Sequence, residues 1–241
     1  MALDEAGAFS QVKPQEFERI TPDGVIPALI FASGGSPLTV GPDGYMYYGT
    51  DGSDSFPTGA LAVARLSARG EEQLFAPALK EKLAELHDGI TGLASGPDGS
   101  IYVATWNGII VVNAHGSIAR VVYPVAVKDC DSDPADHNPA NASSPLLRGL
   151  GVDSRGNVYV AATSCHRVLK ITPAGQVTSI LKSERPWTPT GVAVRGEDIY
   201  VLEYTNGNGP ATEGWRPRVR KRAKDGTWTT LVTVPNSSAP R

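Results

Sequence analysis

The feature that most constrains this chain is a strand–turn–strand unit that recurs along its length. The clearest copy runs from Leu147 to Leu181 as LRGLGVDSRGNVYVAATSCHRVLKITPAGQVTSIL, with short apolar runs separated by turn signals. Runs rich in Val, Ile and Tyr that alternate with polar residues and end at Gly, Asp, Asn or Pro are typical of β-strands joined by tight turns. This segment therefore predicts one antiparallel meander of four strands, here called a, b, c and d.

Both hairpins of this meander recur elsewhere in the chain. The inner a–b hairpin repeats as GPDGYMYYGT at 41–50, GPDGSIYVAT at 96–105 and, in a more worn form, VRGEDIYVLEYT at 194–205. The outer c–d turns carry glycine at positions 24, 70, 116, 175 and 226, which are spaced by 46, 46, 59 and 51 residues. A repeat of about 40–50 residues that holds four strands is the signature of a β-propeller blade. We therefore predict an all-β propeller of four-stranded antiparallel blades.

The blade count is expected to be five, with an atypical first blade in residues 1–35. Five outer hairpins are present but only four inner ones, and GAFSQVK at 7–13 is the nearest substitute in the first blade. The alternative is that the chain is a portion of a six-bladed protein. The 241 residues are expected to form a single domain. Its full blades are expected at 36–80, 90–125, 146–184 and 188–234.

Two of the repeats resemble those of NHL-repeat propellers. GNVYVAATSCHRVLKITPAGQV at 156–177 and, less closely, GSIYVATWNGIIVVNAHGSI at 99–118 look like that family's repeat, in which Gly-Asn-Ile-Tyr-Val-Ala-Asp is followed by a segment around His-Arg. The resemblance covers roughly residues 36–234 and implies the propeller fold. It does not select an activity, because such propellers include lyases, lactonase relatives, extracellular sensor domains and interaction scaffolds.

Charge and composition exclude several classes of partner. A net charge of −3 with both signs interspersed predicts no general affinity for nucleic acid or for a membrane. No run of 18 apolar residues could span a bilayer. The start, MALDEAGAFSQ, lacks the basic and apolar regions of a signal peptide. We expect a monomer, with a dimer through the atypical first blade as the alternative.

The two cysteines, Cys130 and Cys165, fall in the loop that enters one blade and in the b–c loop of that blade. Both loops are expected on one face, so either a disulfide or two free thiols is compatible with the pattern. Disulfides persist mainly outside the cytoplasm. A disulfide would therefore indicate a periplasmic or secreted protein whose signal is absent here, and free thiols would fit a cytoplasmic one.

Long connections are expected on one face of the propeller, since the a–b and c–d turns on the other face are short. They are 51–58, 76–89, 123–145, 182–189 and 205–217. Long loops on a rigid scaffold usually carry binding residues, so this face is predicted to bind a ligand; the alternative is that the loops only pack over the ring. Residues 78–86, apolar at 79, 83 and 86, predict a short structural helix.

Aromatic residues concentrate in this long-loop face. Trp106, Trp187, Tyr204 and Trp215 follow or precede its strands. Such side chains suit sugars, planar rings or a peptide, although each could instead pack beneath its own loop.

The positions where each a strand begins point toward the channel mouth, and they hold Ser36, Thr91, Arg148 and Thr190. In the gluconolactonase-like family, which this chain resembles only in its overall repeat, such positions hold an ion through Glu, Asn and Asp. Hydroxyls and an arginine make a poor calcium cage, so the resemblance does not imply the lactonase mechanism. Arg148 suits a carboxylate or phosphate, or else an ion pair with a loop Asp.

Other candidate metal ligands are His87, Asp88, His137 and His166. The peptidyl-hydroxyglycine lyase propellers, another distant resemblance, hold zinc with histidines, but the spacing here matches no zinc motif. The Asp-x-Asp-x-Asp run at 129–133 is followed by Pro134 rather than the glycine of a calcium loop. The sequence therefore identifies no cofactor, and the alternative is a divalent ion, calcium or zinc.

Glu203 ends a b strand where other blades have Ala104 or Ala162, which makes it a candidate general base or ligand anchor. Its alternative role is an ion pair with Arg216 or Arg218. The alternating arginines 216, 218, 220 and 222 are expected to form a charged blade edge. Two functions follow: binding of a small anionic or aromatic ligand or a peptide on the long-loop face, or the activity of a metal-dependent hydrolase or lyase at the same channel mouth.

Overall fold

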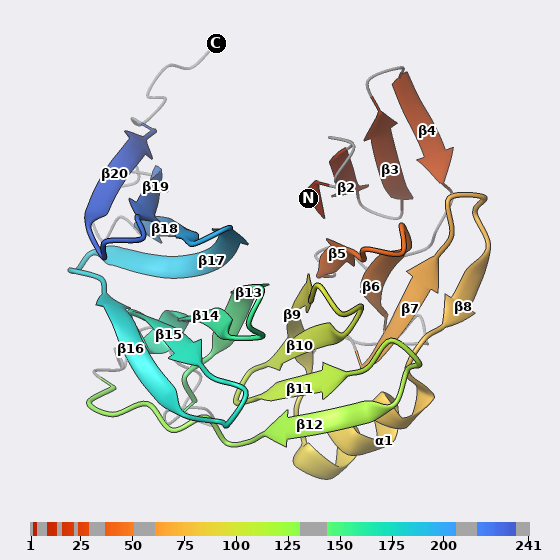
Figure 1. Ribbon diagram of the computed structural model, residues 1–241, viewed down its shortest axis with the longest axis horizontal. Coiled ribbons are helices and arrows are strands. Elements are labelled where there is room, and N and C mark those ends of the chain that lie inside the picture. Colours follow the sequence, from red (N-terminus) through yellow and green to blue (C-terminus); the bar gives the residue numbers. More distant parts are fainter. Residues whose placement is uncertain are drawn as a thin grey trace, which may run out of the picture. The chain divides into compact units, whose positions relative to one another are not determined.

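Figure 1 shows the computed structural model of the chain. The structure describes residues 37–50, 61–130, 144–205 and 216–234, together with the backbone of four strands within residues 2–28. The chain divides into two compact units, Met1–Tyr123 and Pro124–Arg241, and each is described by itself.

The first unit contains two fully described four-stranded sheets. They consist of β5 (Leu38–Val40), β6 (Met46–Thr50), β7 (Ala62–Leu66) and β8 (Glu72–Leu74), and of β9 (Ile90–Ser95), β10 (Ile101–Thr105), β11 (Ile109–Val112) and β12 (Ile118–Val122). Helix α1 (Pro77–Leu86) lies between β8 and β9 in the chain. A further sheet, described as backbone only, pairs β1 (Ala2–Leu3), β2 (Phe9–Lys13), β3 (Glu16–Thr21) and β4 (Gly24–Ala28).

The second unit contains two more sheets of the same kind. They consist of β13 (Leu147–Val152), β14 (Val158–Ala162), β15 (Arg167–Ile171) and β16 (Val177–Lys182), and of β17 (Trp187–Arg195), β18 (Asp198–Thr205), β19 (Arg216–Arg222) and β20 (Trp228–Thr233). A short 3-10 helix, η3 (Thr163–Cys165), follows β14.

Each sheet is an antiparallel meander in which neighbours in sequence are neighbours in the sheet (Figure 1). This is the topology of a propeller blade, so the prediction of an all-β propeller of four-stranded antiparallel blades is confirmed. The expected count of five or six is not: four blades are described in full. The sheet β1–β4 departs from them at its inner strand, because β1 has only two residues and pairs with β2 through Ala2 and Leu3 alone. That short strand is where the sequence lacks the inner-hairpin pattern.

The short turns form because their residues satisfy the backbone locally. In the turn between β13 and β14, the Asp153 carboxylate accepts hydrogen bonds from the backbone N–H groups of Arg155 (2.9 Å) and Asn157 (2.9 Å). Gly156 closes this turn at φ 74°, a left-handed conformation that glycine adopts without strain.

The core lies between neighbouring sheets. Every residue of the b strands β10 and β14 is buried, which accounts for their continuous apolar sequence. The predicted helix at 78–86 is confirmed as α1, and its Leu79 and Leu83 are buried in the core of the first unit. In the part of the chain that the structure describes, no helix has the length and apolar character needed to cross a membrane.

Because the sheets are antiparallel meanders, the start of each a and c strand and the end of each b and d strand lie at one end of a blade. We call this the long-loop end. The opposite end, which carries the a–b and c–d turns, is the short-turn end. In the second unit, the connections 163–166 and 183–186 both lie at the long-loop end.

Candidate functional site

The a strands β13 and β17 approach each other closely at Gly149 of β13 and Gly191 in the middle of β17. A Cβ atom on Gly149 would lie 2.8 Å from the Cα of Gly191 and 2.9 Å from the carbonyl oxygen of Thr190. The absence of a side chain at Gly149 therefore permits this contact. As a result, Arg148 and Thr190 are neighbours at the long-loop end of the second unit.

Arg148 is exposed, and its guanidinium makes no hydrogen bond or ion pair with any described residue. The alternative ion pair with a loop Asp is thus not seen among these residues. Thr190 is half-buried, and its hydroxyl donates a long hydrogen bond to the carbonyl oxygen of Leu202 (3.4 Å). The Arg148 guanidinium at the start of β13 therefore has N–H donors that no described residue uses.

Glu203 is fully buried on β18 and both of its carboxylate oxygens have partners. One oxygen accepts a hydrogen bond from Arg218 Nε at 2.6 Å, and the other accepts one from the Ser183 hydroxyl. The Arg218 guanidinium also lies over the Trp187 ring, 4.1 Å from its centroid. A buried carboxylate needs such partners to offset its lost hydration. Ser183 was missed from sequence because it follows β16 with no local pattern that marks a contact to β18.

This geometry bears on the chemistry that Glu203 can perform. A general base needs an oxygen free to accept a proton from a ligand, whereas here both oxygens are engaged. Of the two roles weighed from sequence, the ion pair with Arg218 is the observed contact, and the catalytic role stays a prediction.

His166 links the b–c loop to the connection before β17. The residue is buried and adopts φ 51°. Its Nδ1 lies 3.1 Å from the carbonyl oxygen of Trp187 and 3.3 Å from the hydroxyl of Thr188, while Nε2 has no partner among the described residues. A carbonyl oxygen only accepts, so Nδ1 is the donor to Trp187. The backbone carbonyl of His166 accepts from Ser183 N–H (2.8 Å), which joins this loop to the Glu203 network.

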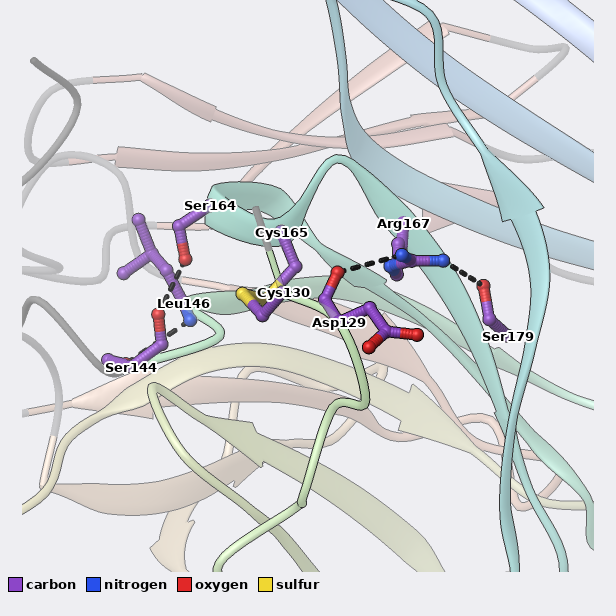
Figure 2. Close-up of a disulfide and its surroundings, with 8 residues drawn as sticks. All are labelled: Asp129, Cys130, Ser144, Leu146, Ser164, Cys165, Arg167 and Ser179. Carbon is purple, nitrogen blue, oxygen red and sulfur yellow. Dashed lines mark hydrogen bonds between the residues drawn. A yellow bond between two sulfur atoms is a disulfide. The ribbon is translucent and has the colours of Figure 1, made fainter. Parts of the chain in front are cut away.

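Of the two alternatives left open by the sequence, a disulfide between Cys130 and Cys165 is the one observed, with 4.7 Å between the two Cα atoms. Figure 2 shows that it joins the loop before β13 to the end of η3. Beside it, Arg167 donates to the backbone carbonyl of Asp129 (2.8 Å) and contacts the hydroxyl of Ser179 (3.5 Å). Asp129, considered from sequence as part of a calcium loop, therefore contributes its carbonyl to Arg167.

The same loop is also attached at its other end. The Ser164 hydroxyl donates to the carbonyl oxygen of Ser144 (2.5 Å), and Leu146 N–H donates to the Ser144 hydroxyl (3.2 Å; Figure 2). A disulfide and hydrogen bonds thus join the residues around η3 to the segment that precedes β13. This attachment positions the start of β13, where Arg148 lies.

In the first unit, Asp88 organises the turn that follows β10. One carboxylate oxygen accepts from the backbone N–H groups of Gly89 (2.8 Å) and Trp106 (2.9 Å). The other accepts from the Thr105 hydroxyl (2.9 Å) and from the backbone N–H of Asn107 (3.1 Å). The buried carboxylate is consequently engaged in hydrogen bonds that stabilise this turn. Its hydrogen bond from the Trp106 N–H brings Asp88 and Trp106 together. Its metal-binding role stays a prediction.

The remaining candidate ligands are described only in part. His87 is exposed at the C-terminal end of α1, and His137 lies outside the described residues, as do Ser36 and Trp215. Within the described ranges, no three His, Cys, Asp or Glu side chains gather to hold a metal ion. A metal site that involves His87 or His137 stays a prediction.

Other predicted ligand contacts lie at strand ends. Thr91 is half-buried in β9, and its buried hydroxyl oxygen has no partner among the described residues. In the second unit, Tyr204 is half-buried on β18 and is paired in register with Thr188, next to Trp187. Two of the four predicted aromatics, Trp187 and Tyr204, therefore lie at the same end of the same blade.

Comparison with known proteins finds similarity at the level of the fold. No protein-family model matches the chain, and no curated protein sequence matches it. Among solved structures, virginiamycin B lyase from Staphylococcus aureus has 13% identity and a TM-score of 0.59, with 98% of this chain and 69% of that chain covered. A calcium-binding protein, regucalcin, from Agrobacterium tumefaciens has 12% identity and a TM-score of 0.57, covering 97% and 72%.

A gluconolactonase from Xanthomonas campestris has 17% identity and a TM-score of 0.53, covering 83% of this chain and 66% of that chain. At such identities the likeness carries the fold alone. The NHL-repeat resemblance itself stays a prediction. The comparisons support a β-propeller of the kind found in these lyase, regucalcin and gluconolactonase structures.

Proposed function

We propose that this protein binds a small anionic or aromatic ligand, or a peptide, at the long-loop end of its second unit. Arg148 is the proposed anchor for the anionic group. The observation that carries this proposal is an exposed guanidinium at the start of a rigid inner strand, with no partner among the described residues.

The chemistry of the surrounding residues supports this proposal. A guanidinium presents paired N–H donors that match a carboxylate or phosphate. The Thr190 hydroxyl makes only a 3.4 Å hydrogen bond and can turn toward a ligand. The negative charge of Glu203 is balanced by Arg218, so it does not repel an anion nearby. Trp187 and Tyr204 supply aromatic surface at the same end, and Ser36, Thr91 and Trp106 are the corresponding candidates in the first unit.

The test uses benzoate, which combines a carboxylate with an aromatic ring. Isothermal titration of benzoate is expected to give a dissociation constant that rises about tenfold or more in Arg148→Ala, since a hydrogen bond to a charged group contributes about 1.5–3 kcal/mol. Arg195→Ala is the matched control, because Arg195 is an exposed arginine at the opposite end of β17. Equal affinities of Arg148→Ala and wild type, at unchanged melting temperature, would contradict the proposal.

A metal-dependent hydrolase or lyase acting at the channel mouth is the second proposal. Two observations favour it: the fold is like that of a lyase, a gluconolactonase and a calcium-binding protein, and the buried His166 Nε2 has no hydrogen-bond partner among the described residues. Metal analysis of the purified protein is expected to find one zinc or calcium ion per chain, reduced in His166→Gln. Less than about a tenth of an equivalent after dialysis against either ion would rule against this function.

We also propose a location outside the cytoplasm, periplasmic or secreted, because structural disulfides persist mainly in oxidising compartments. Thiol labelling of the protein before extraction from its host cell is expected to leave Cys130 and Cys165 unmodified. Labelling of both cysteines in the native protein would contradict this location.

A further inference from the structure

A polar cavity of about 160 Å³ lies at the short-turn end of the second unit. It is formed where the blade β13–β16 faces the blade β17–β20, beside the turns at 153–156, 195–198 and 223–226. This is the end of the blades opposite to Arg148. The short loops at this end carry no sequence pattern that marks a site.

Two cross-strand rows line the cavity from facing blades. In one blade, Tyr159 of β14 is paired in register with Lys170 of β15. In the other, Val194, Ile199 and Arg222 lie in one row across β17, β18 and β19. Tyr159, Ile199 and Val194 belong to the apolar core between the two blades. The cavity therefore has a packed apolar side, from which Lys170 and Arg222 extend.

Cations outnumber carboxylates around this cavity. Its lining includes four cationic side chains, from Arg155, Lys170, Arg222 and Lys224, and two carboxylates, from Asp153 and Glu197. This excess of positive charge favours an anion.

Both carboxylates are already engaged. Glu197 pairs with Lys224 (2.6 Å) and Arg155 (3.4 Å). Asp153 accepts from the side-chain amide of Asn157 (2.8 Å) and the hydroxyl of Tyr159 (3.1 Å), besides two backbone N–H groups. Burial raises the pKa of Asp153, but these hydrogen bonds more than offset it and the pKa lies below its usual value. Burial and the charge of Asp153 raise the pKa of Tyr159, so its hydroxyl stays protonated as the donor.

Lys170 and Arg222 are the two cations that remain without a carboxylate. Lys170 Nζ lies 5.8 Å from the centroid of the Tyr159 ring, and neither side chain forms an ion pair with any carboxylate in the described ranges. An ammonium and a guanidinium beside one cavity can hold one doubly charged anion between them.

We propose that this cavity is a phosphate-binding site in which Lys170 and Arg222 hold the anion, which is either free inorganic phosphate or the terminal phosphate of a monoester. Its volume corresponds to about five water molecules in the liquid. Pockets for drug-sized ligands are about 300–1,000 Å³, so the space accepts one small polar group, and the rest of a monoester would lie outside it. The site is separate from the Arg148 anchor and does not depend on the function proposed there.

The experiment is a titration of the whole chain with inorganic phosphate at constant ionic strength, followed by calorimetry. Wild type is expected to bind one phosphate saturably, and Arg222→Gln and Lys170→Gln are each expected to weaken binding at least tenfold. Arg220→Gln is the matched control: Arg220 lies on the same strand, but its guanidinium is over the Trp228 ring (5.2 Å) and does not line the cavity. This variant is expected to bind within twofold of wild type.

Each outcome decides the proposal. The absence of saturable phosphate binding by folded wild type would overturn it, as would wild-type affinity in both Arg222→Gln and Lys170→Gln. Malonate binding as tightly as phosphate would overturn the assignment to phosphate, whereas glycerol phosphate binding as tightly as phosphate would support a monoester. If a variant does not fold, amide chemical shifts of Gly196 and Tyr159 in wild type decide, since phosphate must move them. Loss of benzoate binding at Arg148 leaves all these results unchanged.

Discussion

The ion pair between Glu203 and Arg218 permits a quantitative test of how the second unit is held together. Removing one partner of a buried pair costs about 3–5 kcal/mol because the other charge is left uncompensated. The Glu203 side chain is 0% exposed and Arg218 is 16% exposed. Replacement of Glu203 strands a cation that still reaches some water, so the lower end of the range applies. We expect Glu203→Gln to lower the free energy of unfolding by about 3 kcal/mol.

Urea denaturation followed by circular dichroism measures this loss, and the same change should lower the melting temperature by about 6–12 °C for a chain of this size. Glu85→Gln is the matched control. Glu85 also pairs with a cation, Lys82 at 2.5 Å, but its side chain is 64% exposed, so a loss of less than about 0.5 kcal/mol is expected.

A double-mutant cycle with Arg218→Met then separates the pair from its surroundings. The double variant carries no unpaired charge at this position, so its loss should be smaller than the sum of the single losses by at least about 1 kcal/mol. Strict additivity, or a loss below about 1 kcal/mol for Glu203→Gln alone, would show that the carboxylate is better solvated than its burial indicates.

Two further predictions concern the same unit. Reducing the disulfide between Cys130 and Cys165, which are 35 residues apart, should lower the free energy of unfolding by about 2–4 kcal/mol; unfolding curves with and without dithiothreitol that coincide would contradict this. The folded pKa of Asp153 lies below its ordinary value of 3.8, so its ionised form contributes stability above that value and loses it as the pH falls through the lowered one. The unfolding free energy of wild type should therefore fall more steeply below about pH 4 than that of Asp153→Asn. If the unfolding free energies of the two proteins fell in parallel as the pH was lowered, the lowered pKa of Asp153 would be refuted.

Much of the architecture could be predicted because its signals are local. Alternating Val, Ile and Tyr with a turn every few residues specify hairpins, and the spacing of leucines at 79, 83 and 86 specified α1. The proximity of Cys130 and Cys165 also followed from topology, because both flank strand ends at the same end of one blade.

The roles of individual polar residues were harder to predict from the sequence. Asp88 is a residue type that often binds metals, but it accepts hydrogen bonds from Gly89 and from three residues at and after the end of β10. This arrangement is visible only when the segment after α1 and the end of β10 are placed side by side. Glu203 likewise reads as an isolated acid in the sequence, and Ser183, its second partner, lies 20 residues away.

By itself, then, the amino-acid sequence determined the strands, their antiparallel order and which ends of the blades carry long connections. Tertiary structure alone decided that Arg222, interpreted from sequence as one of four edge arginines, lines a cavity with Lys170 of the neighbouring blade. The physical reason is range: hairpins are set by backbone preferences over a few residues, whereas a charge acquires its partners, or lacks them, through the packing of separate sheets.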